Sequence, residues 1–129
     1  MRGVDTNIVI RFLLGDDERQ SAAARAVIDT PCLVPMTVLL ETVWVLESRY
    51  EFARADVVRL LRYFVDLETV HCDNPAMIVW ALARYQSGAD IADMLHLVEA
   101  RDATQFTTFD RRLAKRAGPK PPVPVETLR

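Results

Sequence analysis

Short apolar segments alternate with segments of helical periodicity along the whole chain, and this alternation limits the possible folds more than any other feature. Strands are expected up to Val4 and over 32–34, 69–71, 104–109 and 123–125. Helices are expected over 6–14, 17–29, 37–50, 54–67, 74–87 and 111–116, with one more beginning after Asp90. Parallel strands need helical crossovers, so this order predicts a parallel sheet covered by helices on both faces.

The length and composition favour one globular domain over residues 1–129. A chain of 129 residues, half of them hydrophobic, is sufficient for a single core. The formal net charge is −2, so no strong basic field marks the protein as a high-affinity nucleic-acid binder. A nearly neutral chain of this size is still compatible with an enzyme that contacts a few phosphates.

The cysteines and the apolar runs indicate a cytoplasmic protein without a membrane segment. Cys32 and Cys72 are far apart and form no C-x-x-C pair, so cysteine alone provides no zinc site. The N-terminus has no long apolar stretch of the signal-peptide kind. Glu41 interrupts the longest apolar run well short of a membrane span.

Four acidic residues are placed where carboxylates are unusual: Asp5, Glu41, Asp93 and Asp110. Asp5 and Asp110 each follow the carboxyl end of an expected strand, which is where open parallel sheets bind ligands. Glu41 interrupts an almost wholly apolar helix, where burial without a partner costs several kcal/mol, so a metal partner is favoured over an arginine. Together the acids predict a carboxylate cluster, and such clusters bind hard divalent cations.

Each acid also has a simpler interpretation. Asp is a favoured helix cap, which fits Asp5 and Asp110. Asp90 and Asp93 are spaced as in a capping box, so Asp90 is expected to be a cap first and a ligand second. The basic run 111–116 fits either a solvated helix face or a phosphate contact. The large apolar side chains, Trp44 among them, are expected in the core.

The order of these motifs resembles the PIN-domain nucleases. The segments that carry the resemblance are Val4-Asp5-Thr6-Asn7, the mid-chain Glu41, the run from Ala89 to His96, and Thr107-Thr108-Phe109-Asp110. The likeness covers essentially the whole chain and is greatest to VapC-type toxins of bacterial toxin–antitoxin pairs. No single motif is specific, but all of them in this order form a strong signal.

The resemblance implies a three-layer α/β/α sandwich with a central, mainly parallel sheet, in which the first strand neighbours the strand before Asp110. It implies that Asp5, Glu41, Asp93 and Asp110 are catalytic and bind Mg²⁺ or Mn²⁺ for hydrolysis of RNA phosphodiester bonds. It also implies a homodimer and an antitoxin protein that inserts near the acids, with DNA contacted only through that antitoxin. Polar residues expected to support the site are Thr6, Asn7, Asp90 and Thr108.

Two other functions fit the same sequence. A phosphoryl-transfer domain of the receiver or haloacid-dehalogenase kind also has an Asp after its first strand, and Lys120-Pro121 is similar to a receiver motif. Asn7, however, stands where a dehalogenase needs a second Asp. The other alternative is a non-catalytic module whose acids bind arginines of a partner.

Overall fold

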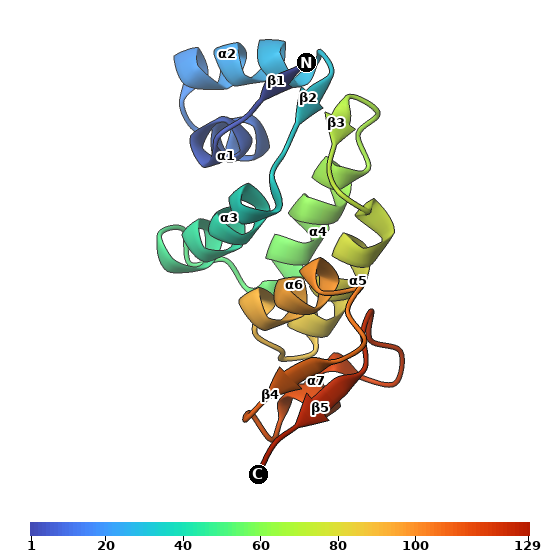
Figure 1. The fold of residues 1–129 in the computed structure, drawn as a ribbon. Helices are drawn as coiled ribbons and strands as arrows, with labels where there is room; N and C mark the ends of the chain where they lie inside the picture. Colours follow the sequence, from blue (N-terminus) through green and yellow to red (C-terminus); the bar gives the residue numbers. More distant parts are fainter. The chain divides into compact units, whose positions relative to one another are not determined.

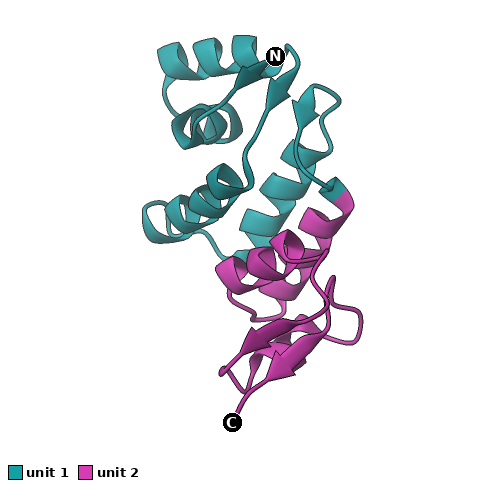
Figure 2. Cartoon of the chain, in the orientation of Figure 1, with its two compact units in different colours: residues 1–75 teal, residues 76–129 magenta.

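Five short strands and seven helices alternate along the chain in the computed structural model, which describes residues 1–129 (Figure 1). The chain divides into two units, Met1–Pro75 and Ala76–Arg129 (Figure 2). All strand pairs are parallel, with three strands in one sheet and two in the other. The expected α/β class with parallel strands is therefore confirmed.

Unit 1 combines four helices with a three-stranded parallel sheet. Its sheet has the order β1-β2-β3, and Val4 extends the ladder because its N–H donates to the Leu33 carbonyl oxygen at 3.0 Å. Helix α1 packs on both α2 and α3, and α3 packs on α4. The elements are β1 (Arg2–Gly3), α1 (Thr6–Leu14), α2 (Glu18–Ile28), β2 (Cys32–Leu33), α3 (Met36–Ser48), α4 (Arg54–Val65) and β3 (Val70–His71).

Local chemistry sets the limits of the first two helices. Helix α1 ends at Gly15, whose φ of +63° is a left-handed conformation that glycine adopts without a Cβ penalty. Asp17 then caps α2 through a bond from the Gln20 N–H to its carboxylate at 3.0 Å. The buried Ser21 hydroxyl donates to the Arg11 carbonyl oxygen at 2.9 Å and links α2 to α1.

Unit 2 combines three helices with a two-stranded parallel sheet. Its elements are α5 (Pro75–Gln86, of which Pro75 closes unit 1), α6 (Ile91–Glu99), β4 (Phe106–Thr108), α7 (Leu113–Ala117) and β5 (Val125–Thr127). Helical spacing predicts an apolar stripe on α6, and its residues are all buried: Ile91, Met94, Leu95 and Val98. Strand β4 pairs with β5 in the register Phe106↔Val125.

The last strand differs from the expected range. It covers Val125–Thr127 instead of 123–125, because the ladder begins where the Pro124 carbonyl oxygen accepts the Phe106 N–H at 2.8 Å. Proline has no N–H for such a ladder, so pairing starts beyond it. Val123 is buried but lies outside the strand. The expected pairing of the first strand with the strand before Asp110 would join the two units and stays a prediction.

Candidate functional site

Asp5 lies where β1 passes into α1, one residue beyond the end of the strand ladder. Its carboxylate accepts the Thr6 N–H at 2.7 Å, so it caps the helix. The cap interpretation of Asp5 is therefore confirmed. The side chain is nevertheless exposed, and a carboxylate holds further lone pairs for a ligand. Asn7 is also exposed, on the first turn of α1.

Thr6 links Glu41 to the end of β1, where Asp5 lies. Helix α3 begins three residues after β2, and Glu41 lies in the second turn of this helix. The Thr6 side chain is almost fully buried, and its hydroxyl donates a hydrogen bond to Oε1 of Glu41. Asp5 and Glu41 are thus both hydrogen-bonded to Thr6, one to its N–H and the other to its hydroxyl.

The expected burial of Glu41 is wrong. Helix α3 buries one stripe, Leu39, Thr42, Val43 and Leu46. Glu41 lies off that stripe and is exposed. Trp44 also lies off the stripe and is 49% exposed, although it was expected in the core. The desolvation argument for a metal at Glu41 therefore fails. The hydrogen bond from Thr6, the residue after Asp5, is what now links Glu41 to the candidate site.

In unit 2, α6 and β4 position the remaining acids. Asp90 caps α6, since its Oδ1 accepts the Asp93 N–H at 3.0 Å. The Asp110 N–H donates to Oγ1 of Thr108 at 3.0 Å, and Oδ1 of Asp110 accepts the Arg112 N–H at 2.9 Å. Thr108 and Asp90 therefore fix the backbone that carries the acids.

The acids of unit 2 interact electrostatically. Burial raises the pKa of Asp93, and the negative charges of Asp90 and Asp110 raise it further, while His96 and Arg116 act in the opposite direction. Asp93 is half-buried on the first turn of α6. These carboxylates are close enough to repel one another, and a bound cation would relieve that repulsion.

The donor chemistry fits a hard cation. Asp5 and Glu41 belong to unit 1, and Asp93 and Asp110 belong to unit 2. All four offer carboxylate oxygens, the ligands that Mg²⁺ and Mn²⁺ prefer. Within either unit alone, no three His, Cys, Asp or Glu side chains are grouped so as to hold a metal ion. The cysteines are free thiols, and burial raises the pKa of both.

A sequence model of the PIN domain matches residues 4–119. This chain belongs to the PIN domain family. The match runs from the end of β1 to beyond α7 and includes all four acids. No curated protein matches the chain.

Membership of the PIN domain family indicates a nuclease fold, and PIN domains are generally hydrolases that bind divalent metals. This favours the nuclease interpretation over a receiver or dehalogenase-like domain. No helix of the PIN-domain protein is both long and apolar enough to span a membrane.

Unit 2 of the PIN domain also has a hollow that we call the basic pocket. It is lined by Arg84, Ser87, Arg112, Lys115 and Arg116, with a volume of about 420 Å³. The run 111–116 was expected to contact either solvent or phosphate, but Arg84 was missed. It lies on α5, far from that run in sequence, and only the tertiary fold brings it to α7.

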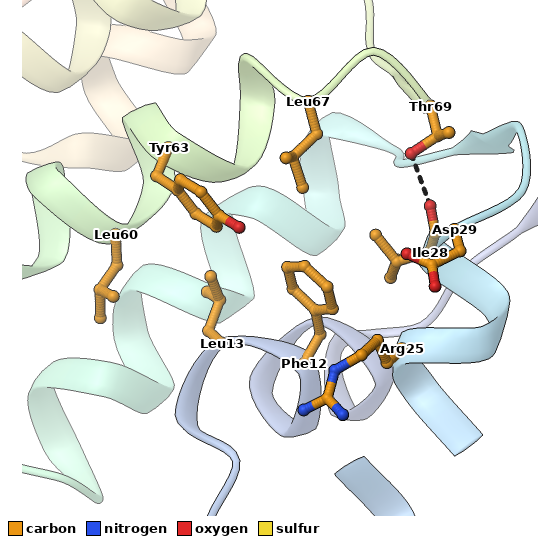
Figure 3. A pocket seen from close by; sticks show the side chains of 9 residues that line it. All are labelled: Phe12, Leu13, Arg25, Ile28, Asp29, Leu60, Tyr63, Leu67 and Thr69. Carbon is orange, nitrogen blue, oxygen red and sulfur yellow. Dashed lines mark hydrogen bonds between the residues drawn. The ribbon is translucent and has the colours of Figure 1, made fainter. Parts of the chain in front are cut away.

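Unit 1 has a second hollow, which we call the unit 1 groove, of about 400 Å³ between α1, α2 and α4, and its polar lining residues are Arg25, Asp29 and Thr69. Its apolar lining is Phe12, Leu13, Ile28, Leu60, Tyr63 and Leu67 (Figure 3). Tyr63 is 58% exposed at this groove. At the other end, the Thr69 hydroxyl donates to the Ile28 carbonyl oxygen at 2.5 Å.

Proposed function

We propose that this PIN-domain protein is a Mg²⁺- or Mn²⁺-dependent endoribonuclease and the toxin of a bacterial toxin–antitoxin pair. One observation carries the proposal. Within the PIN match over residues 4–119, Asp5 and Asp110 each stand just past the carboxyl end of a parallel strand. The Thr6 hydroxyl adds Glu41 to the first of these positions, and Asp93 interacts electrostatically with the second.

The proposed metal ligands are Asp5, Glu41, Asp93 and Asp110. When bound, a divalent ion would make hydroxide available near neutral pH and stabilise the charge that develops on the phosphate. The protein's own contribution is orientation. Thr6 holds the Glu41 carboxylate through its hydroxyl. The chain needs no serine, cysteine or histidine nucleophile for this reaction.

We expect purified protein, free of any antitoxin, to cleave a structured RNA in millimolar Mg²⁺ or Mn²⁺ and to lose this activity in excess chelator. The reason is that carboxylates without a cation only repel the phosphate. Gel analysis of end-labelled RNA measures the cleavage, and restoring the metal should restore it. Cleavage that continues unchanged in chelator would contradict metal dependence.

The proposed antitoxin combines two contacts that the two units offer. An arginine of the partner would pair with the carboxylates, which accept its bidentate fork. An amphipathic helix of the partner would place its apolar residues against Phe12, Leu60 and Tyr63 in the unit 1 groove. Contact with DNA is expected only through this partner.

Expression of the protein alone should arrest bacterial growth, and co-expression of the short reading frame adjacent to its gene should relieve the arrest. Tyr63→Glu should keep the arrest in the presence of that partner, because it places a charge in the groove. Arg62→Glu changes an exposed neighbour outside the groove and should still be relieved. Colony counts under both conditions decide this, and equal relief of the two variants would contradict docking in the groove.

A homodimer is also proposed, on the family resemblance alone. Sedimentation equilibrium of the purified protein should give twice the mass of 14.6 kDa. A monomeric mass at micromolar concentration would contradict the proposal without affecting the nuclease assignment.

A further inference from the structure

The basic pocket concentrates positive charge on a protein whose net charge is negative. Arg84, Arg112, Lys115 and Arg116 bring four cations to one hollow, while the whole chain carries −2. The ion pairs of the protein involve other residues, namely Arg11, Arg54 and Arg59. None of the four pocket cations has a carboxylate within ion-pair distance. The pocket therefore carries uncompensated positive charge, which favours binding of an anion.

Two of these arginines are fixed in place by backbone oxygens. Nε of Arg84 donates to the Arg116 carbonyl oxygen at 2.7 Å, and Nη1 of Arg116 donates to the Gly88 carbonyl oxygen at 2.6 Å. A Cβ on Gly118 would lie 3.0 Å from Cζ of Arg84, a tight contact, and the φ of +82° at this position itself favours glycine. Each guanidinium carries five N–H donors, and most of them stay free for a ligand.

The pocket adjoins the acids of unit 2. The positive charge of Arg116 acts on Asp93, and the N–H of Arg112 is bound by the Asp110 carboxylate. A polyanion that reaches Asp93 and Asp110 therefore meets these cations. Fixed guanidinium groups match the geometry of phosphate oxygens particularly well.

An exposed aromatic ring favours a nucleic acid over other polyanions. Phe109 is 73% exposed and directly precedes Asp110. Aromatic rings beside a basic groove provide stacking platforms for the bases of single strands. An acidic peptide or a free phosphate has no base to stack there.

We propose that the basic pocket binds a backbone phosphate of single-stranded RNA beside the cleavage site, with a neighbouring base stacked on Phe109. The proposal deepens the proposed ribonuclease function and rests on it for the identity of the substrate. It assigns a binding role to Arg84, Arg112, Lys115 and Arg116, none of which belongs to the four acids.

The test measures binding without cleavage. A dye-labelled single-stranded RNA oligonucleotide is titrated with the full-length protein in excess chelator, and fluorescence anisotropy gives Kd at several salt concentrations. The double variant Arg112→Gln with Lys115→Gln removes two exposed cations whose side chains make no structural bond. The control, Arg19→Gln with Arg62→Gln, removes the same charge from exposed positions in unit 1.

The pocket variant should bind on the order of tenfold more weakly at low salt, with a log–log salt slope lower by about 1.4 for two lost contacts to a single strand. The control should keep both the parent's Kd and its slope. Arg84→Lys keeps the charge but loses the planar fork and the bond to Arg116, so it should weaken binding less than the double variant. Phe109→Leu should weaken RNA binding and leave competition by inorganic phosphate unchanged.

Equal Kd values for the pocket and control variants would overturn the proposal. Tighter binding of a polyglutamate peptide than of RNA, lost in the pocket variant, would assign the pocket to a protein partner and overturn it as well. These results are independent of cleavage. A parent protein that cleaves RNA but binds it equally well without the pocket cations refutes only the pocket. A parent protein that binds RNA through the pocket but never cleaves it refutes only the nuclease function.

Discussion

Replacing Asp93 by asparagine should lower RNA cleavage by at least about a hundredfold at saturating Mg²⁺, the scale seen when a group that holds a metal or stabilises developing charge is removed. The fold should tolerate the change. The Asp93 backbone N–H donates to Asp90, whereas its own carboxylate caps nothing, and asparagine has nearly the same shape. Initial rates on one labelled RNA, with melting temperatures measured in parallel, give the result.

Two controls separate a metal ligand from a helix cap. Asp90→Asn should keep much of the activity, because asparagine caps a helix about as well as aspartate and the bond to the Asp93 N–H survives. Asp102→Asn removes the charge of an exposed acid just beyond α6 and should leave cleavage unchanged. If Asp93→Asn cleaves RNA as fast as Asp102→Asn, the assignment of Asp93 to the site is wrong.

The sequence was most informative where structure depends on neighbouring residues. A helix was predicted over 6–14, with Asp5 as a possible cap, and α1 covers Thr6–Leu14 with Asp5 as its cap. The strand positions were predicted from short apolar runs bounded by proline and polar residues, and all five strands occur within two residues of those runs. Caps, glycine stops and apolar periodicity act over a few residues, so one sequence reveals them.

The sequence did not predict which face of α3 is buried, or which residues far apart in the chain come into contact. Helix α3 is apolar nearly all round, so its sequence did not show that Glu41 and Trp44 would lie off the buried stripe. The Thr6–Glu41 bond joins residues 35 positions apart. Arg84 was missed for the same reason, since its contact with Arg116 arises only when α5 and α7 pack.

Two acids of the site, Asp5 and Asp110, also accept backbone N–H groups, so a test of the site must change the charge and keep these bonds. The Asp5 carboxylate accepts the Thr6 N–H and the Asp110 carboxylate accepts the Arg112 N–H. The amide oxygen of asparagine can accept the same bonds. Asp5→Asn, Asp93→Asn and Asp110→Asn therefore remove one charge each while the local hydrogen bonds remain.

If the acids share a metal, the parent should be stabilised by about 2.7 kcal/mol when Mg²⁺ reaches a hundred times its Kd, because the ion binds only the native state. Each asparagine variant should lose much of this gain. In chelator the variants should instead be more stable than the parent, by on the order of 1 kcal/mol, since one repulsive charge is gone. Such differences correspond to shifts of a few degrees in melting temperature for a domain of this size.

Thermal melts of the parent and the three variants, each in chelator and in Mg²⁺, therefore distinguish residues that bind a metal from residues that only hydrogen-bond to the local backbone. Crossed behaviour, with variants more stable without metal and less stabilised by it, requires that the carboxylates repel one another and share a cation. Asp16→Asn serves as the control, because Asp16 pairs with Arg11 on the surface at 3.1 Å and its loss should leave the response to Mg²⁺ intact. Flat melts in both conditions would mean that Asp5, Asp93 and Asp110 only shape the backbone, and the catalytic proposal would be lost with the metal.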